Sequence, residues 1–144
     1  MGDAARRPVP LAAIAVATVL AAAATAAANA LLRALAVAVF DIPDAFEHLA
    51  LRAVVVSSVF GVIAGGLVFA LVARFARAPV RTFAVVATVV LVASLGAPLS
   101  VGLEDPPEYA GTNAESVGTM MAMHVVAAVI CVTALGAAWR RATA

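Results

Sequence analysis

The sequence predicts an all-α membrane protein, folded as an antiparallel bundle of four transmembrane helices. Of its 144 residues, 65% are hydrophobic and only 12% are charged, and the mean hydropathy is +1.12. A domain this small cannot hide so much apolar surface from water, because soluble domains are only about half apolar and about a quarter charged. The composition therefore excludes a soluble enzyme, a soluble nucleic-acid-binding protein and a disordered tail.

Four continuous apolar runs are the second observation behind this prediction. A helix needs about 20 residues to cross a ~30 Å hydrocarbon layer, whereas barrel strands are shorter and alternate in polarity. We expect a single domain over residues 1–144 with spans at about residues 11–32 (extending as far as residue 40), 53–73, 82–101 and 116–138.

The distribution of charge is the third observation. Seven of the nine arginines lie at the N-terminus, between the second and third spans, and at the C-terminus, where one acid, Asp3, leaves a net +6. The other two links hold seven acids and two arginines, a net −5, and the two sums give the +1 of the chain. Because arginines in short loops stay on the cytoplasmic side, we expect a multi-pass protein of the cell membrane with both termini cytoplasmic.

Two prolines precede the first span, as suits a helix start. A signal peptide is the alternative, since small residues flank Asn29 as they would a cleavage site. The apolar run exceeds the roughly 7–15 residues of a signal peptide, so we expect an uncleaved helix. Its polar residues share one arc of about 80° and are expected to face protein rather than lipid. They are Thr18, Thr25, Asn29 and Arg33.

Local signals also mark the other three spans. Two pairs with capping-box spacing predict where the second and fourth helices begin. They are Asp44 with Glu47, and Thr112 with Glu115. Near the end of the third span, Pro98 is expected to kink or terminate the helix.

Small residues are expected to form the packing surfaces. Alanine accounts for 39 of the 144 residues, and small side chains let transmembrane backbones approach closely. In the second span, Ser57, Gly61 and Gly65 recur every four residues and form a small-residue ridge. We expect this ridge to pack against another helix of the same chain, and the alternative is a homodimer or a contact with another membrane protein.

A band of polar residues is expected to converge in the outer half of the bilayer, where chemistry would have to reside. Its members are Asn29, Ser57, Ser58, Ser94 and His124. Three interpretations of His124 are open: a metal or haem ligand, a proton-handling residue, or an interhelical hydrogen bond to a serine, Asn29 or a backbone carbonyl. His48 lies at the outer mouth, Cys131 lies about 10 Å away along the helix axis, and no acid lies inside a span. We therefore expect the hydrogen bond, and no metal or cofactor.

The outer links are expected to form a solvated acidic rim. The charges at its mouth are Arg33, Arg52, Asp44 and Glu47. Asp44, His48 and Arg52 are spaced to pair along one helix face. The lack of an intramembrane carboxylate argues against a proton-coupled multidrug antiporter. No nucleophile–base pair is evident, so we expect no enzyme, and topology explains the inner arginines without nucleic acid.

Three stretches in the second half carry a family resemblance. They are Ala78-Pro79-Val80-Arg81 before Phe83, Ser94-Leu95-Gly96-Ala97-Pro98-Leu99, and Met123-His124. Over residues 79–141, their order resembles an uncharacterised family of small prokaryotic four-helix integral membrane proteins, a domain of unknown function. The resemblance implies a fold and a membrane location but no known activity, and it marks Pro98 and His124 as the most recognisable positions.

From these features we expect a small accessory or structural membrane component. The alternative is a small-solute or ion permease that uses the polar band. The two differ in the interior: a permease needs a hydrated cavity that joins the band to the outer links. An accessory protein needs a small-residue surface on the second helix that faces lipid or a partner.

Overall fold

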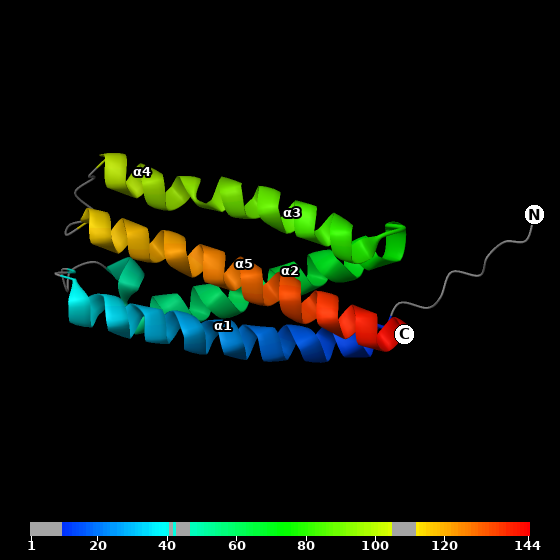
Figure 1. Cartoon of the computed structure of the whole chain (residues 1–144). Helices are drawn as coiled ribbons and strands as arrows, with labels where there is room; N and C mark the ends of the chain where they lie inside the picture. Colours follow the sequence, from blue (N-terminus) through cyan, green and yellow to red (C-terminus); the bar gives the residue numbers. More distant parts are fainter. Residues whose placement is uncertain (1–9, 41, 43–46, 105–111) are drawn as a thin grey trace, which may run out of the picture.

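The four apolar runs form four long helices in the computed structural model, which describes residues 10–40, 42, 47–104 and 112–144 (Figure 1). The spans are α1 (Leu11–Val39), α2 (Leu51–Phe75), a third made of α3 (Pro79–Ser94) and α4 (Gly96–Glu104), and α5 (Ala114–Thr143). A short 3-10 turn, η1 (Glu47–Leu49), precedes α2. Four helices are long and apolar enough to cross a membrane, and the described part of the chain holds no strand. The predicted all-α bundle is confirmed.

Capping at the start of α5 differs from the prediction by one residue. The Asn113 side chain accepts from the Ser116 N–H at 2.8 Å, and Ser116 Oγ accepts from the Asn113 N–H at 3.0 Å. Asparagine is a stronger N-cap than threonine, and the serine hydroxyl returns the second bond as a glutamate would. The predicted capping box of Thr112 with Glu115 is therefore wrong.

The predicted start of α2 is also corrected. Asp44 lies outside the described residues, and Glu47 belongs to η1. α2 begins only at Leu51, with Ala50 as an N-cap that forms no side-chain hydrogen bond. The expected charge pairing requires His48 and Arg52 to lie on one continuous helix. They do not, because η1 and α2 are separate elements.

The third span is interrupted beside Pro98, as predicted. Proline has no N–H to donate to the carbonyl of Ser94, and its ring crowds that carbonyl. The helix breaks at Leu95, and α4 then continues in nearly the same direction (Figure 1). Pro98 is fully buried, and α4 packs against α5.

α1, α2 and α5 form the packed centre, and α3 lies at the edge against α5 and α2 (Figure 1). Of the most apolar window of each span, 33% is buried in α1 but only 11% in the third span. Large apolar side chains such as Phe60, which is 75% exposed, cover the outside. In water such a surface would be an aggregation hazard, whereas lipid is its natural solvent.

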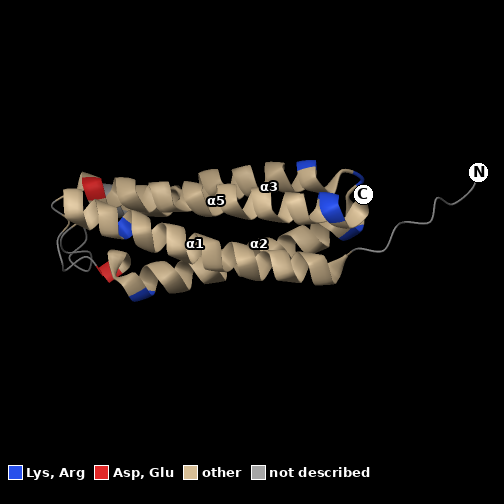
Figure 2. Cartoon of the chain, turned by 60° about the horizontal axis from the view of Figure 1, so that its bottom comes forward, with Lys and Arg blue, Asp and Glu red and all other residues tan. Residues whose placement is uncertain are grey.

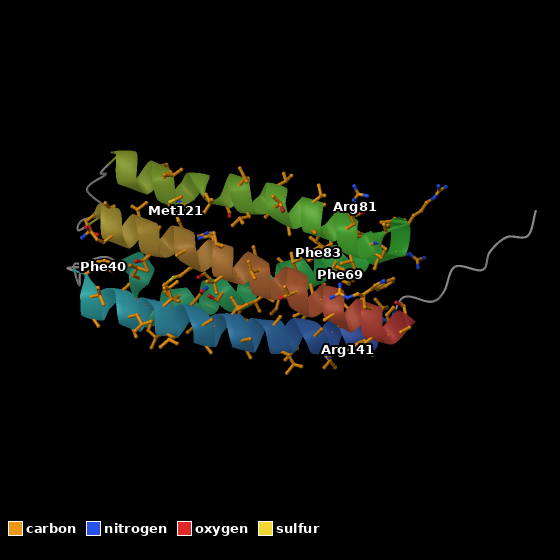
Figure 3. The ribbon with its side chains drawn as sticks, viewed as in Figure 1. Phe40, Phe69, Arg81, Phe83, Met121 and Arg141 are labelled. Carbon is orange, nitrogen blue, oxygen red and sulfur yellow. The ribbon has the colours of Figure 1, made fainter. Side chains whose placement is uncertain are left out.

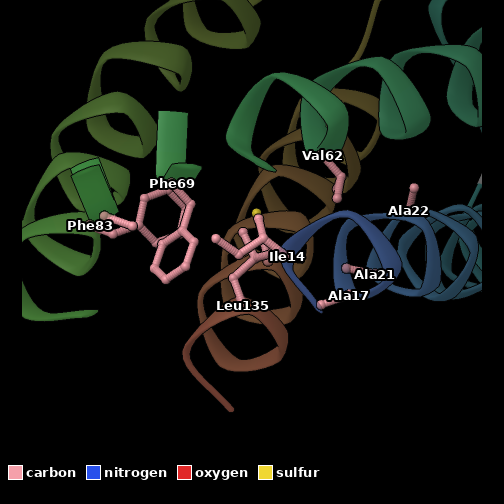
Figure 4. Packing of buried hydrophobic residues seen from close by; sticks show 10 residues of the cluster. Ile14, Ala17, Ala21, Ala22, Val62, Phe69, Phe83 and Leu135 are labelled. Atoms are coloured by element: carbon pink, nitrogen blue, oxygen red, sulfur yellow. The ribbon is translucent and has the colours of Figure 1, made fainter. Parts of the chain in front are cut away.

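In the half of the bundle near the C-terminus, side chains fill the space where α2, α3 and α5 meet, and an open groove of about 660 Å³ lies between α1 and α5 on the side of Ala17 and Ala138. Phe69 of α2 meets Phe83 of α3 edge to face, with ring centroids 5.0 Å apart, and Trp139 of α5 at 6.1 Å. Leu135 of α5 lies beside Ile14 of α1 in the same cluster (Figure 4). Figure 3 shows the two phenylalanines near the end that carries Arg81 and Arg141.

The ridge predicted on α2 does not pack as one unit. A Cβ atom at Gly65 would lie 2.8 Å from Cys131 Sγ of α5, but one at Gly61 would meet no described atom within 4 Å. The close approach to α1 occurs at Gly66, where a Cβ atom would lie 2.3 Å from Thr18 Oγ1. α2 is thus rotated by one residue from the predicted contact face.

Candidate functional site

A cavity of about 390 Å³ lies between α2, α4 and α5, with α1 and η1 closing its sides. Its volume is at the lower end of the roughly 300–1,000 Å³ range of ligand pockets. It lies in the half of the bundle that carries η1, away from the filled half. Its lining consists of Asn29, His48, Val54, Ser57, Ser58, Ala97, Pro98, Ser100, Met120, Met123, His124 and Ala127.

The cavity results from how the third span is built. α2 packs against α3, but its contact with α4 is much weaker, so the two helices diverge towards the end with η1. The side chains that line this gap are small, such as Ala97 of α4 and Ser57 of α2. Small side chains leave the widened space unfilled.

Asn29 is the most deeply buried polar residue of the cavity, at 3% exposed. Its Nδ2 donates to Ser58 Oγ of α2 at 2.9 Å and to the Met123 carbonyl of α5 at 3.4 Å. Its Oδ1 is buried and has no hydrogen-bond partner among the described residues. The amide thus joins three helices and leaves one acceptor unpaired, which is costly unless a ligand or water supplies a donor.

The polar stripe predicted on α1 faces protein, as expected. Thr25 is 0% exposed and Asn29 is buried, while Thr18 and Arg33 are half-buried. Thr18 Oγ1 donates to the Ile14 carbonyl of its own helix at 2.8 Å.

His124 makes its hydrogen bond within its own helix, so the expected interhelical bond is wrong. Nδ1 lies 2.8 Å from the carbonyl oxygen of Met120. Side chains in a helix point back towards its N-terminus, so this ring reaches the carbonyl one turn earlier before it reaches another helix. The ring is half-buried and lines the cavity.

The serines of the predicted band separate into two groups. Ser57 and Ser58 line the cavity, and Ser57 Oγ also donates to the Val54 carbonyl at 3.2 Å. Ser94 is not among the lining residues, and its Oγ donates to the Leu91 carbonyl at 2.8 Å. The structure therefore brings together four members of the band and leaves Ser94 outside.

The predicted row of charges at the outer mouth is not carried by one continuous helix, because His48 belongs to η1 and Arg52 to α2. Arg33 Nε donates to the Leu49 carbonyl, which ties η1 to α1. Arg52 and Glu47 are exposed, and Asp44 lies outside the described residues. Arg33 thus serves as a clamp between two elements.

Cys131 lies in the filled half, beside Gly65, and does not line the cavity. Within the described ranges, no three His, Cys, Asp or Glu side chains gather as metal ligands would.

Sequence reasoning missed several lining residues. His48 and Ser100 approach the cavity from η1 and α4, and Met120 from α5. The predicted break at Pro98 was a signal for an altered path of the chain. Only tertiary packing shows that α4 forms a wall of the cavity.

Four helices that are long and apolar enough to cross a membrane define the class of the protein: an α-helical integral membrane protein. The family model described as "Family of unknown function (DUF6069)" matches residues 5–141, and the chain belongs to this family. The match confirms the resemblance seen in the second half and extends it over the first. No curated protein and no solved structure matches the chain.

Proposed function

We propose that the protein is a non-enzymatic permease of the cell membrane that takes up a small polar solute through this cavity. The observation that carries the proposal is a cavity of about 390 Å³ lined in part by Asn29, whose buried Oδ1 has no hydrogen-bond partner among the described residues. An unpaired buried acceptor costs about 1–3 kcal/mol, and a ligand or water that donates a hydrogen bond to it would remove that cost. Thr25 Oγ1, outside the cavity lining, is the other buried polar side-chain atom without a partner among the described residues. A dry, filled interior at this level would have argued against a permease.

The distribution of charge supports an orientation in which the cavity opens outwards. Arg74 lies in the last turn of α2, and Arg140 and Arg141 lie in the last turn of α5, while Glu115 lies in the first turn of α5 at the opposite end. Figure 2 shows most of the basic residues at one end of the bundle and the acidic residues at the other. By the positive-inside rule, we place both termini in the cytoplasm, and the filled half with Phe69 then closes the inner side.

Cysteine labelling tests the cavity and the orientation together. In a Cys131→Ala background, we expect Ser57→Cys to react with a membrane-impermeant thiosulfonate added to intact cells, because Ser57 lines the cavity. Val62→Cys, five residues further along α2 and only 2% exposed, is the matched control and stays unlabelled. Arg77→Cys reacts only in inverted vesicles.

Two results would count against these proposals, and they differ. A Ser57→Cys variant that stays unlabelled in both preparations shows that water does not enter the cavity, and the permease is rejected. If Ser57→Cys reacts only in inverted vesicles and Arg77→Cys only in intact cells, the orientation is reversed.

A second candidate is an accessory component that associates through α2. Gly61 supports it. A Cβ atom built there would meet no described atom within 4 Å, so no contact with the described residues requires a glycine at this position. Glycine nevertheless costs up to about 1 kcal/mol relative to alanine in a helix. A second copy or another membrane protein that packs closely on this surface would account for the glycine.

Oxidative crosslinking in bilayers tests this second candidate. If a second copy packs there, Gly61→Cys in the Cys131→Ala background gives a disulfide-linked dimer. Val90→Cys, also exposed and on α3, is the control and gives none. Equal crosslinking at both positions indicates random collision in the membrane and removes the support for the homodimer.

A further inference from the structure

We propose that the solute of this cavity carries an ammonium N–H group, as the ammonium ion or as a small primary amine in its protonated form. The inference rests on the proposed function, since it names the chemistry of the solute that the cavity takes. It follows from the hydrogen bonds that Asn29, Ser57, Ser58, Ser100 and His124 make at the cavity.

The hydrogen bond of His124 determines what its ring offers. The carbonyl oxygen of Met120 can only accept, so Nδ1, 2.8 Å away, carries the hydrogen. In a neutral imidazole, the other nitrogen is then an acceptor. The neutral ring of His124, which lines the cavity, therefore carries an acceptor at Nε2.

The amide of Asn29 has its orientation determined in the same way. The Met123 carbonyl accepts from Nδ2. If the amide were flipped by 180°, Oδ1 would face the Met123 carbonyl oxygen instead, and two acceptors would meet. Both hydrogens of Nδ2 are used, by Met123 and by Ser58 Oγ. What remains is Oδ1, a second acceptor without a partner in the described structure.

The hydroxyl groups add further acceptors. Ser57 Oγ donates to the Val54 carbonyl at 3.2 Å, and Ser100 Oγ donates to the Ala97 carbonyl at 2.9 Å. Their hydrogens are used, and their lone pairs remain. Ser58 Oγ accepts from Asn29 and keeps its own hydrogen, so among Asn29, Ser57, Ser58, Ser100 and His124 the remaining acceptors outnumber the remaining donors.

A ligand that fits these atoms must be rich in N–H donors. A primary ammonium group has three N–H donors and no acceptor, and hydrogen bonds from a charged donor are stronger than neutral ones. Val54, Pro98 and Met120 form apolar walls that suit a short alkyl chain. The two links at this end of the bundle carry seven acids against Arg33 and Arg52, a net −5, and this negative charge attracts cations.

Binding of radiolabelled methylammonium to the full-length protein in nanodiscs tests this inference. Unlabelled propylammonium and inorganic ammonium are expected to compete, whereas tetramethylammonium, which has the charge but no N–H, is not. Stronger competition by propylammonium assigns the site to primary amines, and equal or stronger competition by inorganic ammonium assigns it to the ammonium ion.

Three variants separate binding from folding. Ser57→Asp adds a carboxylate at an exposed lining position and is expected to tighten methylammonium binding roughly ten-fold or more, because an opposite charge a few ångströms away attracts the cation. His124→Leu removes an acceptor and weakens binding roughly ten-fold or more. Ser94→Ala, a serine outside the lining, is the control and leaves binding unchanged.

Two outcomes would overturn the inference. Competition by tetramethylammonium equal to that by propylammonium shows that charge alone is recognised, and unchanged affinity in Ser57→Asp shows that methylammonium does not occupy the cavity. If methylammonium fails to bind while Ser57→Cys is labelled from outside, the ammonium inference fails and the solute site stands. If Ser57→Cys is also unlabelled, both fail.

Discussion

Replacing Gly66 with alanine is expected to lower the free energy of unfolding of the bundle by roughly 1–3 kcal/mol, the usual cost of forcing extra atoms into a packed interior. The added Cβ would lie 2.3 Å from Thr18 Oγ1, 2.5 Å from its Cγ2 and 3.0 Å from its Cβ. Thr18 cannot simply turn away, because its own Cβ is one of the crowded atoms and its hydroxyl is bonded to the Ile14 carbonyl. α1 and α2 must therefore move apart.

The measurement is thermal or denaturant-induced unfolding of the protein in detergent, followed by size-exclusion chromatography. Gly61→Ala is the matched control on the same helix. Its Cβ meets no described atom within 4 Å, so it should leave stability unchanged or raise it by up to about 1 kcal/mol through helix propensity. Thr18→Gly should restore part of the loss in the Gly66→Ala protein. A Gly66→Ala variant as stable as the parent would show that the helices do not approach so closely.

Replacing Phe69 with alanine is expected to lower the free energy of unfolding by about 3–5 kcal/mol, the range for large aromatic side chains in a packed core. Phe69 is 0% exposed and lies between Phe83 of α3 and Trp139 of α5. Its removal leaves a cavity where α2, α3 and α5 meet. The packing of α3 should be weakened most, because its buried residues are Pro79 and Phe83, and Phe83 loses its contact with the Phe69 ring.

Phe60→Ala is the matched control, on the same helix and with the same chemical change. Phe60 is 75% exposed, and lipid or detergent fills the space that its ring leaves, so we expect a change within about 0.5 kcal/mol. Equal losses in the two variants would contradict the structure, because they would require Phe60 to be packed as tightly as Phe69.

These two predictions concern the filled half, but they bear on the proposed permease. A solute that enters the cavity can leave on the other side only if the contacts of Phe69 and Leu135 open. The third span is interrupted at Leu95 and has the lowest buried share of the four spans.

Much of the fold could be predicted because hydropathy and local chemistry act residue by residue. The four spans follow from the transfer of apolar side chains into lipid, and the break beside Pro98 follows from one missing N–H. The buried stripe of α1 follows from helix periodicity, which places Thr25 and Asn29 on one face. None of these depends on knowing which helix lies next to which.

The candidate site was predicted only in part, because its members come from five elements. Asn29, Ser58 and His124 were correctly placed at one level of the bundle, since depth along a helix can be counted. Ser94 lies at a similar depth but makes its hydrogen bond within α3 and lies outside the cavity lining. Depth does not determine the direction in which a helix faces.

The sequence by itself determined the environment, the number of helices and the segregation of charge, because each is a sum over neighbouring residues. Only the tertiary structure decided the rotation of α2, which brings Ser58 to Asn29 and Gly66 to Thr18. It also decided that α4 diverges from α2 and leaves a cavity. A shift of one residue rotates a helix by about 100°. Small apolar side chains pack similarly in either rotation, so only a few contacts between helices, such as the hydrogen bond from the Asn29 amide to Ser58, select one rotation over the other.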